Sequence, residues 1–170
     1  LGQFNELFRI VGENSLAALH AFILNIKTAE TVFELLNQKH PTEHVTILQR
    51  AVDLYPQVAS LKLINILLDY GANTELDEPT SREDGLPSID INVESDRKFQ
   101  TPLWSAVLKN APYELVELLL EYKADIYFTH TIEDTKSYSL LHLAVFVGID
   151  ERTLDLLVES GKSLLVNDQR

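Results

Sequence analysis

Apolar residues recur along this chain with helical spacing, in short stretches that come in pairs. Three of them fall on one side of a helix that begins at Thr101: Leu103, Ala106 and Val107. The residues Asn-Ala-Pro at 110–112 interrupt this pattern, and a second apolar stretch covers residues 115–120. The spacing therefore predicts two helices joined by a turn, with the second ending near residues 123–125.

Local sequence signals support these helix boundaries. The Thr101 hydroxyl can accept a hydrogen bond from a free backbone N–H at the helix start, and Pro102 at the first helical position costs no helical hydrogen bond. Pro112 is expected to start the second helix in the same way. Gly71 and Gly161 stand where a helix favours a left-handed residue just past its end, so we expect two other helices to stop there.

The same order of residue types recurs three more times, starting at Ala17, Thr46 and Ser139. A helix pair of this kind cannot bury its apolar face alone, so successive pairs must stack on one another. Stacked pairs form extended surfaces that suit binding better than catalysis. Residues 2–11 also have helical apolar spacing, which predicts a capping helix before the first pair.

The repeated unit resembles the ankyrin repeat, which begins Thr-Pro-Leu-His, continues through alanines and a glycine, and ends Gly-Ala-Asp or Gly-Ala-Asn. The best copies are residues 101–125 and 139–161, and residues 71–73, Gly-Ala-Asn, end a third. The resemblance implies an all-α solenoid of about four helix-turn-helix repeats within a single domain, 1–170. The expected parts are a capping helix at 1–15, repeats at 16–44, 45–73, 100–128 and 138–170, and an insertion at 74–99.

The chain departs from the ankyrin pattern in its connections and in one side chain. Within the insertion, residues 89–94 alternate apolar and polar, which predicts a strand in an extended or hairpin-like arm. The connection 128–138 is expected to form a larger hairpin. His20 and His142 keep the histidine of the repeat motif, which the resemblance implies braces neighbouring turns. Gln49 and Trp104 replace it, and we expect Trp104 to pack against the insertion or the adjacent loop.

Composition narrows the class of protein and of partner. The chain has 170 residues, enough for one folded domain, and its formal net charge is -12. This charge disfavours nucleic acid and anionic membranes as partners, and no apolar run is long enough to insert into a bilayer. The absence of cysteine fits a reducing compartment. Because residues 164–166 are still apolar, we expect the native polypeptide to continue with more repeats or another domain.

Three short motifs have a catalytic or metal-binding interpretation, and each has a simpler one. Gly-Lys-Ser at 161–163 lacks the upstream glycine of a phosphate-binding loop. His40 and His44 have zinc-ligand spacing without a third ligand, and we interpret them as exposed turn histidines. The acidic residues alternating over 90–96 lack the glycine of a calcium loop. We therefore expect no catalytic residues, no metal, no cofactor and no small-molecule substrate.

A binding surface is expected on the concave side of the stack, where the resemblance implies that partners meet the turns and first helices. Apolar and aromatic positions there would form an interaction patch beside a basic rim. The rim suggests a peptide that carries acidic and apolar residues. The expected binding residues are Leu54, Arg97, Lys98, Leu108, Lys109, Phe128, Lys136, Tyr138 and Phe146.

The sequence thus favours a cytoplasmic module that binds a partner protein or peptide through the ankyrin groove. The irregular repeats also resemble those of bacterial effectors, for which the host cytoplasm would be the site of action. Two alternatives stay open. The chain could recruit substrate for a catalytic domain that lies outside it, or it could act as a structural spacer.

Overall fold

A computed structural model of the chain describes residues 2–26, 29–72, 101–127, 129–132 and 136–167. The structure there is almost entirely helical, with one two-stranded antiparallel hairpin. The expected arm at 74–99, with its strand at 89–94, lies outside the described residues.

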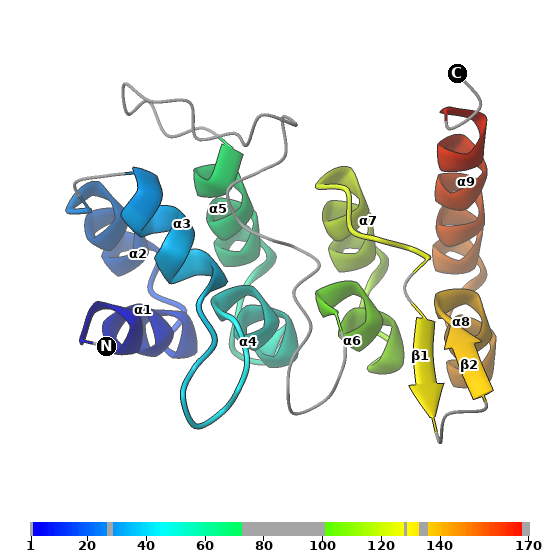
Figure 1. Cartoon of the computed structure of the whole chain (residues 1–170), viewed down its shortest axis with the longest axis horizontal. Helices are drawn as coiled ribbons and strands as arrows, with labels where there is room; N and C mark the ends of the chain where they lie inside the picture. Colours follow the sequence, from blue (N-terminus) through cyan, green and yellow to red (C-terminus); the bar gives the residue numbers. More distant parts are fainter. Residues whose placement is uncertain (1, 27–28, 73–100, 128, 133–135, 168–170) are drawn as a thin grey trace.

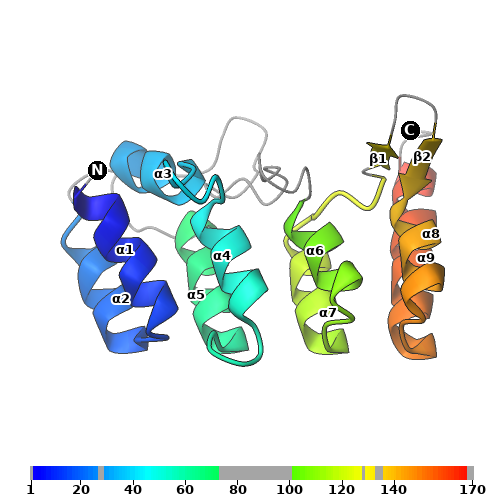
Figure 2. The ribbon, with the colours of Figure 1, turned by 90° about the horizontal axis from the view of Figure 1, so that it is seen from below.

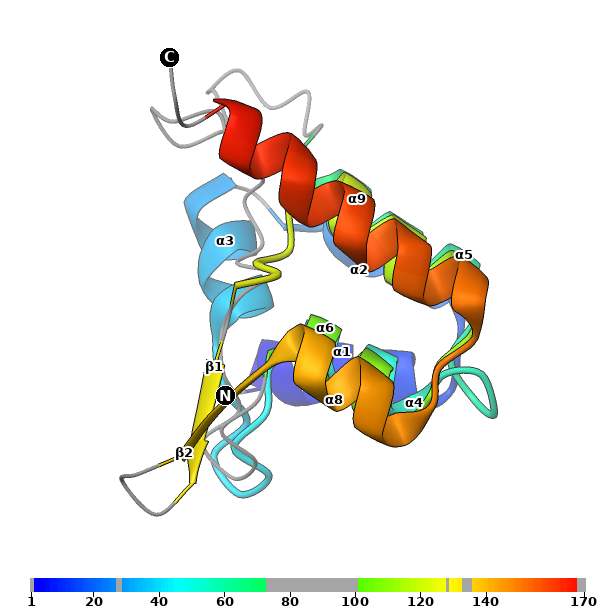
Figure 3. The same ribbon diagram turned by 90° about the vertical axis from the view of Figure 1, so that its right-hand side faces the viewer.

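Eight of the helices form two parallel rows (Figures 1 and 3). The inner row contains α1 (Gly2–Gly12), α4 (Ile47–Leu54), α6 (Pro102–Leu108) and α8 (Leu140–Val147). The outer row contains α2 (Leu16–Leu24), α5 (Leu61–Ala72), α7 (Tyr113–Glu121) and α9 (Glu151–Asn167). Each inner helix packs on the next one in its row, and Figure 2 shows the pairs α1/α2, α4/α5, α6/α7 and α8/α9 as successive columns.

The remaining elements lie on one side of these rows. Helix α3 (Ala29–Asn37) and strands β1 (Thr129–Ile132) and β2 (Lys136–Ser139) all lie beyond the start of the inner helices (Figure 3). Residues 129–132 pair with residues 136–139 in antiparallel register, which confirms the hairpin expected between residues 128 and 138.

The first helix pair differs from the one expected. The sequence interpretation treated residues 2–11 as a cap and placed the first repeat at 16–44, whose helices correspond to α2 and α3. In the structure α1 stands in the inner row and α2 in the outer row, while α3 lies outside both. The physical reason is the tight turn after α1, where Asn14 is left-handed and Ser15 caps α2 by accepting a hydrogen bond from the Ala18 N–H.

Three inner helices begin with the hydroxyl caps that the sequence predicts. The side chains of Thr46, Thr101 and Ser139 each accept a hydrogen bond from the backbone N–H three residues later. Pro102 occupies the first turn of α6, as expected. These caps fix where each inner helix starts, so equivalent positions on different helices can be compared by counting from them.

Left-handed residues end several helices, but not at the glycines expected. Asn14, Asn110, Lys123 and Gly148 have positive φ, and in each case the following N–H reaches back to a carbonyl oxygen five residues earlier. Gly161 instead lies inside α9, so the prediction that it ends a helix is wrong, whereas α5 ends at Ala72, one residue after Gly71. Asparagine adopts the left-handed conformation more readily than most residues that carry a side chain.

The core lies between the two rows and along them. It is built from leucine, isoleucine, valine and small alanine side chains, with Phe4, Phe8 and Trp104 as its large aromatic members. Ala51, Ala106 and Ala144 are fully buried and let the inner helices approach one another closely. Trp104 is therefore part of the core itself rather than a residue that only covers a loop.

Candidate binding surface

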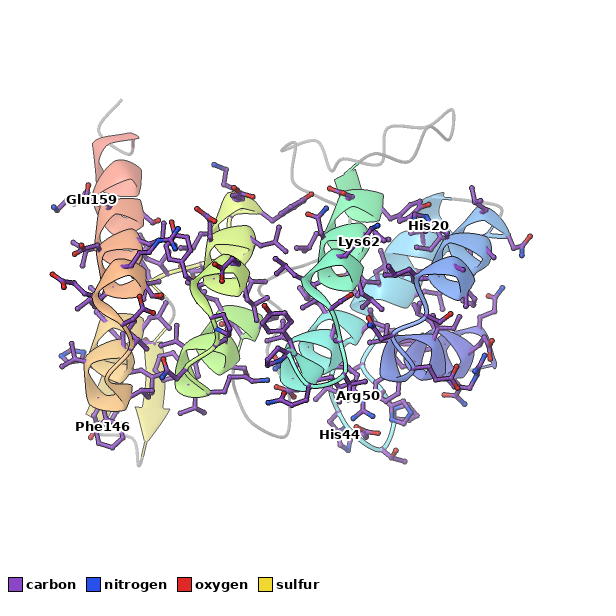
Figure 4. The ribbon with its side chains drawn as sticks, turned by 180° about the vertical axis from the view of Figure 1, so that it is seen from behind. His20, His44, Arg50, Lys62, Phe146 and Glu159 are labelled. Carbon is purple, nitrogen blue, oxygen red and sulfur yellow. The ribbon has the colours of Figure 1, made fainter. Side chains whose placement is uncertain are left out.

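The exposed side of the inner row carries two apolar side chains at equivalent positions. Phe146 on α8 is 88% exposed and Leu108 on α6 is 44% exposed. Each follows the N-cap residue of its helix, Ser139 or Thr101, by seven positions. Because α6 and α8 pack side by side, equal spacing directs both side chains toward the same face. In Figure 4 Phe146 points away from the outer row.

The hairpin adds an aromatic side chain next to this face. Tyr138 on β2 is half-exposed and directly precedes the cap of α8. Figure 3 shows the hairpin running crosswise to α8, so the two elements form an angle. We call Leu108, Tyr138 and Phe146 the inner apolar surface. Large exposed apolar groups on adjacent elements are typical of protein interaction sites.

Lys109 does not belong to the basic rim that the sequence suggested. Its ammonium group donates hydrogen bonds to the carbonyl oxygens of Val52, Asp53 and Tyr55, at 2.9, 2.8 and 2.5 Å. These carbonyls end α4, which has no left-handed residue after it and continues instead into an extended Tyr55. The lysine therefore caps a neighbouring helix, where a positive charge also favours the helix dipole.

The other expected binding residues divide into two groups. Leu54 ends α4 and is half-buried, so it contributes little free apolar surface. Lys136 pairs with Ile132 in the hairpin, and its side chain is outside the described part. Arg97, Lys98 and Phe128 lie outside the described residues. Of the expected binding residues, Leu108, Tyr138 and Phe146 are thus exposed on neighbouring elements, and no cation among the described residues completes the expected rim.

Two exposed apolar residues of α8 were not among the expected binding residues. Leu141 and Val145 on α8 occur at helical core spacing, so their sequence pattern predicts burial. Their exposure depends on which helices lie beside α8, and a single-helix pattern carries no such information.

The residues at the motif histidine position use different contacts in each inner helix. His142 and Ser139 form a reciprocal cap, in which the Ser139 N–H donates to His142 Nδ1. Buried Gln49 instead donates from Nε2 to Ser105 Oγ on α6, at 2.9 Å, and to Asp53. His20 lies on outer helix α2 and bonds the Tyr70 hydroxyl on α5, so it does not occupy the motif position.

His40 is part of a packed turn rather than a freely exposed histidine. Its ring stacks on Phe8 with 4.3 Å between centroids, and its Nδ1 accepts hydrogen bonds from the backbone N–H groups of Thr42 and Glu43. The Arg50 guanidinium lies over the other side of this cluster, 5.0 Å from the Phe8 ring centroid. No group of three possible metal ligands occurs in the described part of the chain.

Tyrosine contacts join neighbouring helices of the outer row. Tyr70 meets His20, the Tyr122 hydroxyl donates to Asp69, and the Arg152 guanidinium lies 3.6 Å from the centre of the Tyr113 ring. Burial, and then the Asp69 carboxylate, raise the pKa of Tyr122, because both disfavour the tyrosinate anion. At the start of α9 the hydrogen bond from the Thr153 hydroxyl lowers the pKa of Asp150. These contacts are structural and leave the inner apolar surface unoccupied by any described side chain.

Comparison with known proteins agrees with the repeat identified in the sequence. A search of curated proteins finds no match to the chain. None of the helices in the described ranges is long and apolar enough to cross a membrane. The ankyrin repeat family model matches residues 99–130, which span α6, α7 and the start of the hairpin, and confirms the resemblance of this segment to the ankyrin repeat.

Proposed function

We propose that this chain is a protein-binding module whose four helix pairs stack as an ankyrin-type solenoid. Ankyrin repeats generally mediate protein–protein interaction, and the match at residues 99–130 supports the same role for this chain. The other three helix pairs stand in the same inner and outer rows as α6 and α7, which supports assigning the same type of repeat to them. In this proposal the chain acts in the cytoplasm, by binding and not by catalysis.

The partner contacts the inner apolar surface. The observation that carries this assignment is the near-complete exposure of Phe146, 88%, on a helix that otherwise belongs to the packed inner row. A phenylalanine in water contributes nothing to folding, whereas its burial against a partner stabilises a complex by about 2 kcal/mol. Leu108 on the neighbouring helix and Tyr138 on the hairpin extend the same apolar contact.

The described residues support one part of the expected partner chemistry. Lys109 is held by the end of α4, whereas Arg97, Lys98 and the side chain of Lys136, the other members of the expected basic rim, lie outside the described part. We therefore infer a partner segment with apolar anchor side chains, and the acidic side chains expected beside them stay a prediction.

The test compares the proteins captured by the wild-type chain with those captured by Phe146→Glu/Leu108→Glu. Quantitative mass spectrometry should show at least a tenfold loss of specific partners for the double variant. Leu24→Glu is the matched control, because Leu24 is 77% exposed on the outer row, far from this surface. Circular dichroism checks that all three chains keep the same helicity.

Two results would contradict the proposal. Equal capture by the wild-type chain and the double variant would exclude the inner apolar surface as the binding site. If Leu24→Glu reduced partner capture as much as the double variant does, capture would depend on exposed apolar side chains in general and not on the inner apolar surface. If partners are lost and the recovered complex contains an enzyme acting on them, the module serves as the recruiting part of that enzyme.

A further inference from the structure

The turn between α3 and α4 is built around one ring nitrogen of His40. Nδ1 of this ring accepts hydrogen bonds from the backbone N–H groups of Thr42 and Glu43, at 3.4 and 3.2 Å. The Thr42 hydroxyl lies 3.1 Å from the same nitrogen. The backbone closes the turn as well, because the His40 N–H donates to the Val45 carbonyl and the His44 N–H donates to the His40 carbonyl. The side chain and its own backbone therefore hold this turn in one shape.

Only one protonation form of the His40 ring fits these contacts. A neutral imidazole has one nitrogen that carries a proton and one that accepts hydrogen bonds. Since Nδ1 accepts from two backbone N–H groups, the proton of the neutral ring is on Nε2. A second proton would bind Nδ1 and turn this acceptor into a donor that faces the N–H groups of Thr42 and Glu43. The charged ring is therefore incompatible with the closed turn.

The turn also joins α1 to α4. The His40 ring stacks on Phe8 of α1, with 4.3 Å between ring centroids, and its centroid lies 6.0 Å from that of Phe4. Glu43 pairs with Arg50 of α4 at 3.2 Å. The Arg50 guanidinium in turn lies 5.0 Å from the Phe8 ring centroid. Because one contact leads to each helix, a change in the shape of the turn loosens its attachment to both.

A second proton on His40 would also meet an unfavourable charge. Arg50 contacts the same Phe8 ring as His40, so a charged imidazole would stand close to a guanidinium. Glu43, the carboxylate of the turn, is already paired with Arg50. Helix α1 faces the ring with Phe4 and Phe8. The remaining described charged or titratable side chains on the turn and on the elements beside it are Glu34, Lys39, His44, Asp53, Glu6, Arg9 and Glu13, of which the last three pair with one another on α1.

We propose that residues 40–45 form an acid-sensitive turn, which is closed while His40 is neutral and opens once its ring takes up a second proton. Histidine is the side chain whose charge normally changes between pH 5 and 8. Because the closed turn admits only the neutral ring, the closed form is favoured at neutral pH and is lost as the pH falls. Acid then releases the connection between α3 and α4 from Phe8 of α1.

The position of this turn gives its opening a consequence for the surface of the module. Figure 3 shows the turn on the same side of the rows as α3 and the hairpin, and Figure 4 shows His44 and Arg50 close together there. Pro41, Thr42 and His44 are exposed. Opening therefore changes an exposed part of the module, whereas the inner apolar surface lies on α6, α8 and β2. The acid response goes beyond the proposed binding function and does not depend on it.

Two substitutions at residue 40 separate the hydrogen-bond acceptor from the ring. Asparagine offers an oxygen that accepts backbone N–H groups in turns and takes up no proton in this pH range, so His40→Asn should keep the turn closed. Phenylalanine keeps an aromatic ring against Phe8 but has no acceptor, so His40→Phe should leave the turn open. The wild-type chain should resemble His40→Asn at pH 7.5 and His40→Phe at pH 5.0.

Amide hydrogen exchange followed by NMR measures the opening. Protection of the Glu43 N–H, relative to an unstructured peptide at the same pH, should fall at least fivefold in the wild-type chain between pH 7.5 and pH 5.0. In His40→Asn it should change less than twofold. The Trp104 N–H is the internal reference, because it donates to the Thr101 hydroxyl, which does not titrate. His20→Asn is the matched control, since it removes another histidine and should leave the response of Glu43 intact.

Three outcomes would overturn the inference. Protection of the Glu43 N–H in the wild-type chain could be independent of pH, it could fall equally in His40→Asn, or the Trp104 N–H could lose protection in parallel. The last result would show that acid loosens the whole stack. Because the measurement follows single amides without a partner, failure of the capture test at the inner apolar surface would affect the proposed function alone.

Discussion

The first and last described helix pairs differ in the side chains that they expose to water. At the first end, the exposed side of α1 is polar, and Arg9 forms ion pairs with Glu6 and Glu13 at 2.7 and 2.5 Å. The apolar residues Phe4, Leu7, Phe8, Ile10 and Val11 of α1 are all buried. At the other end, α8 and α9 leave apolar residues in contact with water. Within the described residues, α1 therefore has a polar exposed side, whereas α8 exposes Leu141, Val145 and Phe146.

The largest expected effect compares one position at the two ends. Leu7→Ala should lower the free energy of unfolding by about 3 kcal/mol, because it opens a cavity in a fully buried site. Leu141 precedes the left-handed Gly148 by seven positions, as Leu7 precedes the left-handed Asn14. Leu141→Ala should cost less than about 1 kcal/mol, since that side chain is 39% exposed. Urea unfolding followed by circular dichroism measures both. Equal costs would show that Leu141 is covered in solution.

A smaller effect is expected in the middle of the stack. Lys109→Met keeps an apolar stem but removes the ammonium group that caps α4, and it should cost about 2 kcal/mol. Lys62→Met is the control, because Lys62 is exposed on α5 and should change stability by less than about 0.5 kcal/mol. Lys109→Met should leave partner capture intact. A variant that keeps full stability but loses its partners would return Lys109 to the binding surface.

The smallest expected effects have opposite signs and test the turns. Lys123 is exposed and left-handed, so Lys123→Gly should relieve backbone strain and stabilise the chain by about 1 kcal/mol. Asn14 is also left-handed, but its Oδ1 accepts hydrogen bonds from the N–H and hydroxyl of Ser60, at 3.1 and 3.0 Å. Asn14→Gly should therefore cost about 1 kcal/mol. Thermal unfolding that shifts in the same direction for both variants would contradict this distinction.

Helix starts were the part of the fold that the sequence predicted best. The hydroxyls of Thr46, Thr101 and Ser139 act through a backbone N–H three residues away, so the signal and the structure it creates are adjacent in the chain. Helix ends were predicted less well. Helix α5 ends one residue after Gly71, close to the expected position, but α9 runs through Gly161. The left-handed turns lie at Asn14, Asn110, Lys123 and Gly148.

The binding surface was harder to predict than the helix starts, because it depends on which helices lie side by side in space. Phe146 and Leu108 were predicted as surface residues from their positions relative to the helix caps, and both are exposed. The sequence suggested that Lys109 belongs to the same surface because of its charge. The carbonyl oxygens that accept its hydrogen bonds, at the end of α4, lie more than fifty residues away in the sequence, so the pattern around Lys109 does not indicate them. Leu141 and Val145 occur at the same helical spacing as buried residues of the other inner helices, and a linear pattern does not show that they are exposed.

Buried Gln49 has a consequence for how the stack keeps its alignment. Helices that pack only through apolar side chains can shift along one another by one turn, about 5.4 Å, because one set of apolar contacts can replace another. The Gln49 amide reaches Ser105 Oγ on α6 at 2.9 Å in one alignment only. Sliding would leave this buried donor without its acceptor, at a cost of about 1–3 kcal/mol. The hydrogen bond between Gln49 and Ser105 therefore fixes the alignment of the second helix pair relative to the third.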